Sequence, residues 1–277
     1  MSDRYGGFLR DYSRLLPARA PAYLQPAPAR FIVLSDLHGS NRLDLVQAMI
    51  NTERNAGRDL SAVLILGDLV NFGFPIELRL KRFRASLARL TIPVLVILGN
   101  HDKHGPGDDS LARYLAKIPN VTLMQSGSGY QFPRFGPISV GGFDDPRYFG
   151  DDNTGNAKKQ KPAREAFLKA ARAQGRVPDI VMVHEPYAAG APTALWLNGH
   201  MHAPRLDPAR RRVQVGMFTD GSFYYNRKIH RRAPSNFVLL AARESPEHTS
   251  VASVTFRWDR GIPHLSDIDG AEIPVAL

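Results

Sequence analysis

The sequence contains no cysteine, and this absence excludes a disulfide framework, a thiolate zinc site and a cysteine nucleophile. It also lacks any apolar run near the ~20 residues that a membrane-spanning helix requires. The N-terminus has no apolar core of the kind found in signal peptides. We therefore expect a soluble, cytoplasmic protein without a transmembrane segment, for which peripheral contact with a membrane is one option.

Acidic residues are fewer than basic ones. The 36 lysines and arginines outnumber the 26 acidic residues, which gives a formal net charge of +10. Basic clusters lie at residues 79–84, 158–161, 210–212 and 227–232. Such clusters attract an anionic substrate, a nucleic acid or a lipid surface. Solvated basic faces of an arginine-rich protein explain any single cluster more simply.

The first 30 residues are rich in proline, alanine and arginine, as in the stretch LPARAPAYLQPAPAR. This composition is typical of an arm or linker with little core of its own. The apolar fraction of the whole chain, 43%, is ordinary for a globular protein with a sizeable core. We therefore expect an N-terminal arm over residues 1–30 and one large domain over residues 31–277.

The domain begins with alternating strand and helix patterns. Short apolar runs predict buried strands at FIVLS, AVLIL, VLVIL, DIVMV and ALWL. Apolar residues at helical spacing predict helices over residues 42–50, 75–90, 110–117 and 162–173. Each early crossover spans about thirty residues, which favours parallel strands. Further strands are expected at 121–124, at 138–142 and, after residue 202, at RRVQVG, GSFYY, NFVLLAA and SVTFRW, so the fold predicted is α/β, with two stacked mixed β-sheets flanked by helices.

Metal-binding residue types follow these apolar runs in five clusters. The clusters are Asp36-Leu37-His38, Gly67-Asp68, Gly99-Asn100-His101-Asp102, His184 and Gly199-His200-Met201-His202. They fall at the carboxyl ends of strands, where open α/β sheets place their sites. Helix capping explains an aspartate after a strand when it is taken singly. It does not explain five clusters in order, which hold five of the nine histidines.

The chemistry of these side chains favours a pair of divalent ions. Carboxylate, amide and imidazole ligands without thiolate suit manganese, iron, zinc or cobalt. Two such ions about 3.5–4 Å apart activate a water molecule and hold both oxygens of an in-line displacement. Asp68 is suited to bridge the pair, and Asn100 offers a neutral amide oxygen. We expect two ions drawn from Mn, Fe or Zn, with Mn favoured.

The series D-x-H, G-D, G-N-H-D, an isolated H and G-H-x-H resembles the calcineurin-like metallophosphoesterases, over about residues 31 to 202. This resemblance implies an αββα sandwich with two metal sites. It implies that the first ion is held by Asp36, His38, Asp68 and His202. It implies that the second is held by Asp68, Asn100, His184 and His200. His101 would face the substrate phosphate, as a transition-state stabiliser or as the acid for the leaving group, and Asp102 would orient it.

The sequence departs from the family pattern in several places. Asn71 stands where members often carry aspartate, and we do not expect it to bind metal. The interval between His184 and Gly199 is too short for a large cap. The stretch GGFDDPRY resembles a segment of small bacterial members, some of which act on membrane-associated or lipid-linked phosphoesters. The Asp144–Asp145 pair within it predicts a turn rather than an acid–base pair, because Pro146 follows.

The predicted function is metal-dependent hydrolysis of phosphoester bonds, with an anionic phosphodiester or pyrophosphate-type small molecule or lipid as substrate. One alternative is a nuclease, for which the basic clusters permit a nucleic-acid groove without showing one. The other is a non-catalytic binding scaffold on the same fold, which would be expected to lose ligand residues or His101. The aromatic run Phe223–Tyr225 suits base stacking, but strand packing is the simpler interpretation.

Overall fold

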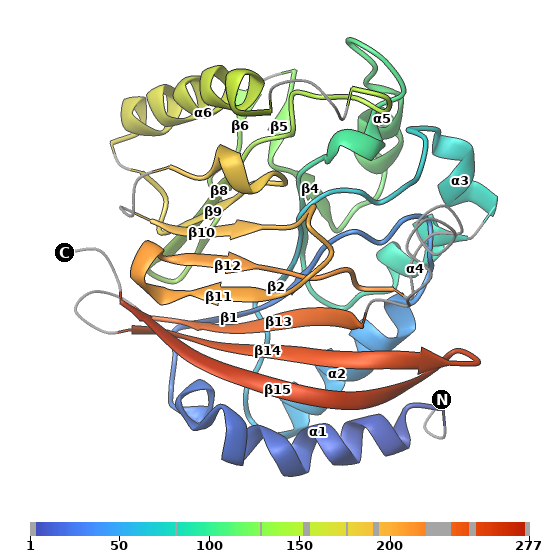
Figure 1. Ribbon diagram of the computed structural model, residues 1–277, viewed down its shortest axis with the longest axis vertical. Helices are drawn as coiled ribbons and strands as arrows, with labels where there is room; N and C mark the ends of the chain where they lie inside the picture. Colours follow the sequence, from blue (N-terminus) through green and yellow to red (C-terminus); the bar gives the residue numbers. More distant parts are fainter. Residues whose placement is uncertain are drawn as a thin grey trace.

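The computed structural model arranges the chain as two facing β-sheets with helices on the outer faces (Figure 1). It describes residues 4–80, 82–127, 129–151, 156–175, 177–190, 194–219, 234–243 and 248–274. The predicted basic cluster at 227–232 and the aromatic run Phe223–Tyr225 lie outside these ranges. The predicted fold class, two stacked mixed sheets flanked by helices, is confirmed.

The first sheet has seven strands and contains the first three predicted strand–helix units. Its order is β15 (Ile262–Pro274), β14 (His248–Asp259), β13 (Ser235–Ala242), β1 (Ala29–Leu34), β2 (Ala62–Ile65), β3 (Val94–Val96) and β4 (Val121–Leu123). Strands β1 to β4 are parallel, whereas β13 to β15 add antiparallel strands beyond β1. Every residue of β1, β2 and β3 is buried, which explains their continuous apolar sequences.

The second sheet has six strands and faces the first. Its order is β11 (Arg205–Asp207), β12 (Arg212–Gln214), β10 (Leu195–Asn198), β9 (Ile180–Met182), β8 (Ile138–Gly142) and β7 (Arg134–Phe135). The four inner strands are parallel, and the edge strands β7 and β11 are antiparallel. A short hairpin of β5 (Gln125–Ser126) and β6 (Gly129–Tyr130) connects β4 of the first sheet to β7 of the second along the chain.

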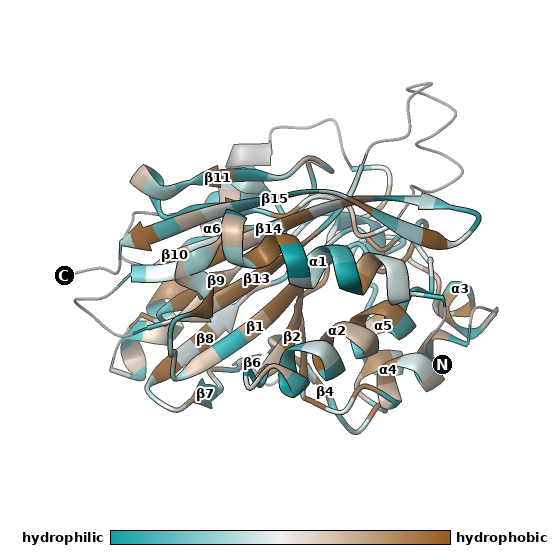
Figure 2. Cartoon of the chain, turned by 90° about the horizontal axis from the view of Figure 1, so that it is seen from below, coloured by the Kyte–Doolittle hydropathy of each residue, from teal (hydrophilic) through white to brown (hydrophobic). Residues whose placement is uncertain are grey.

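Helices complete a four-layer arrangement. Those packed in one core cluster with the first sheet are α1 (Gly6–Arg19), α2 (Leu43–Asn55), α3 (Pro75–Leu80), α4 (Phe83–Ala88) and α5 (Ser110–Leu115). Helix α6 (Asn156–Ala173) covers the second sheet, and a separate core cluster fills the space between the sheets. Figure 2 shows α1 and α2 over the mostly apolar strands of the first sheet. Within the described ranges, no helix is long and apolar enough to cross a membrane.

The N-terminal segment differs from the arm that its composition predicts. Phe8, Tyr12 and Leu16 lie on one face of α1 and are buried. The Phe8 ring packs edge-on against Phe256 at 5.5 Å between centroids, and Tyr12 donates a hydrogen bond to Glu53 at 2.8 Å. The helix is therefore part of the main core. The composition of the segment did not predict this helix, because its few buried apolar residues are interspersed with prolines, alanines and arginines.

The helix predicted over residues 75–90 is two short helices instead. Arg82, between α3 and α4, has a left-handed φ of 52°, which an α-helix does not accommodate. As a result Phe83 and Leu87 are buried, while Ile76, from the same apolar stripe, is 51% exposed. The predicted helical spacing therefore marks the right segment but misplaces one end of it relative to the core.

Candidate metal centre

The five predicted clusters meet at one edge of the two sheets, because main-chain hydrogen bonds join their loops. The loop after β1 is joined to the loop after β2 by bonds from Asp36 N to Gly67 O (3.1 Å) and from His38 N to Asp68 O (2.9 Å). The loops after β9 and β10 are joined by Gly199 N to His184 O at 3.1 Å. The two sheets are connected through the side chain of Asp36, whose Oδ2 accepts from the backbone of the G-H-x-H loop.

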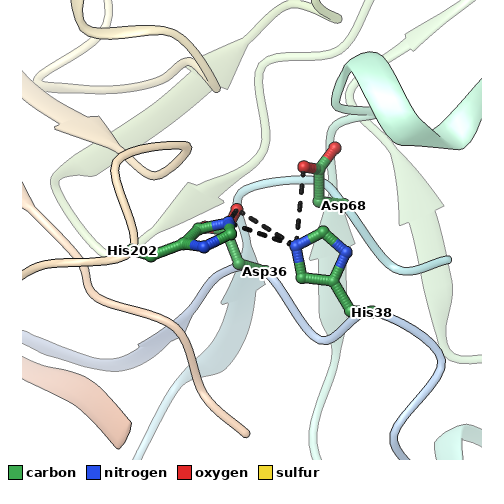
Figure 3. A group of neighbouring side chains, drawn as sticks. All are labelled: Asp36, His38, Asp68 and His202. Carbon is green, nitrogen blue, oxygen red and sulfur yellow. Dashed lines mark hydrogen bonds and ion pairs between the residues drawn. The ribbon is translucent and has the colours of Figure 1, made fainter. Parts of the chain in front are cut away.

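The first group of ligand atoms comes from Asp36, His38, Asp68 and His202, all within 4.8 Å of one another (Figure 3). His202 Nε2 lies 3.0 Å from Asp36 Oδ1 and 3.2 Å from His38 Nε2. His38 Nε2 is 3.9 Å from Asp68 Oδ2. Ligands about 2.1 Å from a tetrahedral ion are separated by about 3.4 Å. The observed spacing therefore fits a divalent cation.

The second group consists of Asp68, His184 and His200, so Asp68 belongs to both groups. His184 Nδ1 lies 2.7 Å from the carbonyl of Leu66, which assigns the proton to Nδ1 and leaves Nε2 facing Asp68 Oδ2 at 3.3 Å. A histidine that binds a metal usually donates its other ring nitrogen in this way. Asn100, the remaining predicted ligand, is buried at the start of the short helix η2 (Asn100–Asp102).

Buried polar atoms without normal hydrogen bonds support the presence of an ion site. Among the described residues, Asp36 Oδ1 and His184 Nε2 are fully buried and have no hydrogen-bond partner of standard geometry. Buried polar atoms are nearly always paired, so each such exception calls for an explanation. A divalent cation between these lone pairs provides one, because it binds carboxylate oxygen and neutral imidazole nitrogen directly.

The backbone of the site is strained in a way that is typical of functional loops. Left-handed φ angles occur at the proposed ligands Asp36 (53°), His38 (46°), Asp68 (55°), His200 (67°) and His202 (56°). In the part of the chain that the structure describes, only three other non-glycine residues have such angles. Each residue with such an angle costs about 1–3 kcal/mol of stability and persists only where the surrounding structure imposes it. Residues of this kind cluster at active sites.

Two glycines of the motifs allow the loops to approach closely. A Cβ at position 99 would lie 2.2 Å from Asp68 Oδ1, and one at position 199 would lie 1.8 Å from Ser35 Oγ. Any side chain at Gly99 would therefore displace the shared carboxylate. Close packing of the loops, as well as a tight turn, explains why the ligands follow glycine.

Neighbouring charges oppose the effect of burial in the site. Burial tends to raise the pKa of Asp68, but the combined attraction of His184, His101 and His38 outweighs it and holds this pKa well below its usual range. Burial likewise disfavours a charged His184, yet the combined attraction of Asp68, Asp36 and Asp145 raises its pKa to about 10. Burial lowers the pKa of His38 to about 4, so its ring is neutral at pH 7. His184 and His38 thus differ in protonation at pH 7.

His101 and Asp102 lie beside the ligand groups but do not form the pair that the sequence suggested. The His101 ring, partly exposed, places Nδ1 2.7 Å from the carbonyl of Asn71. Asp102 is buried, and its carboxylate accepts from the backbone of Leu69 (2.7 Å), Val70 (3.1 Å) and Gly99 (2.9 Å). The predicted role of Asp102 is therefore corrected. It joins two loops, while a main-chain carbonyl orients the ring.

Three buried residues near the site were not predicted from the sequence. Glu185 follows His184 directly, and its Oε2 lies 3.3 Å from His200 Nε2. Arg147, fully buried, pairs with Glu185 at 2.9 Å and with Asp145 at 2.7 Å. Asp145 thus forms a buried ion pair with Arg147, which does not suit it to act as a general acid or base. The adjacency of Glu185 to His184 was the one signal in the sequence that pointed to it.

Fold and site together define a four-layer α/β protein with Asp and His side chains that could hold a metal gathered at the strand ends. The family model of the calcineurin-like phosphoesterases matches residues 29–204, and the chain belongs to this family. Comparison with curated protein sequences gives no match.

Several solved structures are similar to this chain, and one of them, GAP50, supports the fold. GAP50, described as the anchor in the inner membrane complex of Plasmodium, is 13% identical, with 90% of each chain covered and a TM-score of 0.56. Vps29 of Chaetomium thermophilum is 12% identical over 89% of this chain and 97% of its own, with a TM-score of 0.44. The nuclease MPE of Pseudomonas putida is 15% identical over 84% of this chain and 87% of its own, with a TM-score of 0.33.

Proposed function

We propose that this protein hydrolyses phosphoesters at a dinuclear metal centre. One ion would be held by Asp36, His38, Asp68 and His202. The other would be held by Asp68, Asn100, His184 and His200. The observation that supports this most directly is that Asp68 belongs to both groups of ligand atoms, so one carboxylate is placed to bridge two ions. The donor set suits Mn, Fe or Zn, and we favour Mn.

Bound metals would supply an activated water and neutralise charge on the phosphoryl group. The chain's own contribution centres on His101. Its Nδ1 lies 2.7 Å from the Asn71 carbonyl, and Nε2 is the atom that we propose to exchange a proton with the substrate. Its backbone N–H donates to Asp68 Oδ1 at 2.9 Å, which holds His101 beside the proposed bridging ligand. Asp102 supports this geometry by joining the two loops that carry these residues.

The substrate that we propose is a phosphodiester or pyrophosphate-type small molecule or lipid. Three exposed apolar side chains form a surface that we call the apolar lip. They are Phe72, Phe74 and Ile76, which are 41%, 42% and 51% exposed. The lip connects to His101 through Phe149, whose ring lies 5.2 Å from that of Phe72 and 5.6 Å from that of His101.

The lip is held firmly, because the Glu77 carboxylate accepts three backbone N–H groups of residues 71–74 at 2.8–3.2 Å. Exposed apolar side chains on so well-bonded a loop suit contact with an apolar part of the substrate.

Two other functions have some support. Exposed arginines at positions 79, 82 and 84 adjoin the lip and would favour a nucleic acid in a nuclease. The structural likeness to GAP50, an anchor protein, favours a non-catalytic scaffold. Against the scaffold, all proposed ligands and His101 are retained, and six of the seven ligands lie within the two close groups.

A substrate screen with added Mn²⁺ tests these proposals together. Bis-p-nitrophenyl phosphate, a pyrophosphate-linked nucleotide, a phospholipid and duplex and single-stranded DNA should be compared at physiological salt, with His101→Ala as the inactive control. We expect the diester and pyrophosphate compounds or the lipid to be cleaved fastest. Nuclease activity that survives this salt, exceeds the small-diester rate and disappears in His101→Ala would overturn the choice of substrate. Two bound ions without any turnover would favour the scaffold.

A further inference from the structure

A chain of buried polar side chains leads from α6 to the second group of metal ligands. Gln160 donates to Asp145 at 3.0 Å, and Nη2 of Arg147 contacts both Asp145, at 2.7 Å, and Glu185, at 2.9 Å. Glu185 Oε2 then lies 3.3 Å from His200 Nε2. The side chains of Asp145, Arg147 and Glu185 are at most 1% exposed.

Such an arrangement is costly, because each buried charge loses its hydration. Replacing buried ion pairs with apolar residues is often neutral or stabilising, so stability alone gives little reason for this chain. Arg147 is fully enclosed and has no access to a substrate. Arg147 contacts Glu185, and Glu185 contacts the proposed ligand His200, so Arg147 can act on the second group of ligands by holding Glu185 in place.

The carboxylate of Glu185 is fixed in place. It immediately follows the proposed ligand His184 and caps the short helix η3 (Pro186–Ala188), where it accepts from Tyr187 N at 3.4 Å. Its Oε2 is fully buried, and the contacts of this atom have ion-pair distances without standard hydrogen-bond geometry. Contacts of this kind are often loose in an unliganded site and tighten when the partner is held.

We propose that Glu185, held by Arg147, accepts a hydrogen bond from the Nε2–H of His200 and thereby leaves Nδ1 of His200 to bind the second metal. Glu185 is then a positioning residue, which acts on the metal through a ligand. A carboxylate in this place fixes the tautomer and the orientation of the ring and makes the metal-binding nitrogen more basic. The inference rests on the dinuclear centre proposed above.

The second site would then orient its two histidines by different means. His184 donates Nδ1–H to a main-chain carbonyl, which no substitution removes. His200 depends on a side chain, so its orientation is open to mutation. The prediction is specific to one ion, because the ion pairs that Glu185 forms among the described residues are with Arg147 and with His200, a proposed ligand of the second ion alone.

The test is Glu185→Gln, with metal affinity measured by competition against a chelator. We expect the second ion to bind ~10–100-fold more weakly, and the first to bind as in the wild type. The matched control is Glu53→Gln, because Glu53 is also a buried carboxylate paired with an arginine, Arg58, at 2.8 Å. It should lower the melting temperature of the metal-free protein without changing either affinity.

A second measurement needs no variant. In the zinc-loaded wild type, NMR of ¹⁵N-labelled histidine should show His200 protonated at Nε2 and bound through Nδ1. Protonation at Nδ1 would overturn the inference, and so would unchanged affinities in Glu185→Gln. Loss of the second ion even at saturation in that variant would make Glu185 a direct ligand, which also overturns it. A wild type that binds fewer than two ions would refute the dinuclear centre itself, a separate outcome.

Discussion

Two regions of this molecule bury carboxylates, and they treat them in opposite ways. In the core between α1 and α2, Glu53 is fully buried and receives hydrogen bonds at 2.8–2.9 Å from Tyr12, Tyr23 and both Nε and Nη2 of Arg58. At the strand ends, Asp36 and Asp68 are equally buried but face imidazole nitrogens across 3.0–3.9 Å. Both regions use acidic groups enclosed by protein.

The difference is whether the lone pairs are already used. Four donors saturate Glu53, so this region locks α1 onto α2 and has no capacity for a ligand. The strand-end region instead gathers carboxylate oxygens and imidazole nitrogens around two common points, on a backbone with left-handed φ angles. A buried acidic cluster therefore indicates a metal site when some of its carboxylate oxygens have no hydrogen-bond donor. It indicates a structural role when donors saturate the carboxylate.

The most severe change would be Asp68→Asn, which removes the charge shared by both groups of ligands. Because each ion depends on this carboxylate, we expect both to be lost at concentrations that fill the wild type, and turnover to fall to the metal-free level. Metal content after dialysis gives the answer. Retention of both ions would show that Asp68 does not bridge them.

His101→Ala should separate catalysis from metal binding within the same region. The variant should keep both ions and lose about 10²–10⁴ in turnover, the usual effect of removing a group that transfers a proton. Metal content and initial rates are measured on the same sample. Near-normal rates on the best substrate would make His101 a bystander.

Glu53→Gln tests the other side of the comparison. Removing one partner of a buried ion pair typically costs about 3–5 kcal/mol, and the partly exposed Arg58 places this variant toward the lower end. Denaturant unfolding of the metal-free protein measures the loss, and turnover per folded molecule should not change. A variant as stable as the wild type would show that α1 is not anchored through Glu53.

The smallest expected effect is a difference in pH dependence between the two ions. Without metal, burial disfavours a charged His184, but the combined attraction of Asp68, Asp36 and Asp145 outweighs it and raises its pKa to about 10, so binding the second ion must displace a proton. Affinity for that ion should rise with pH, by up to about tenfold per unit between pH 6.5 and 10.

The first ion should show less of this rise, since burial already lowers the pKa of His38 to about 4. The metal-free protein should move the other way: a raised pKa of His184 stabilises the folded state below pH 6.5, and this contribution is lost as the pH rises through 10. Calorimetry in buffers of different ionisation enthalpy measures the released proton. Equal proton release by both ions would contradict the assignment.

The sequence predicted the strands and the ligand clusters because both depend on local patterns. The run FIVL is apolar throughout because β1 is buried on both faces, and the residues after each such strand must lie at one edge of the sheet. Strand β15 was not predicted, because its polar sequence is stabilised by pairing along the whole length of β14. The left-handed break at Arg82 likewise has no signature in the apolar spacing.

The parts of the site that escaped prediction depend on tertiary contacts. Arg147 and Glu185 are 38 positions apart and meet only because β8 and β9 are neighbouring strands. The Asn71 carbonyl that holds His101 is a main-chain atom, so no residue type could reveal it. Sequence patterns thus identify the candidate ligands, whereas the residues that contact and hold these side chains emerge from the fold.

Metal content of the wild-type protein tests the central claim most directly. The purified chain is saturated with Mn²⁺ or Zn²⁺ in a non-chelating buffer, freed of loosely bound ions and analysed for metal and protein. The shared carboxylate of Asp68 predicts two ions per chain. One ion or none at saturation would contradict the dinuclear centre.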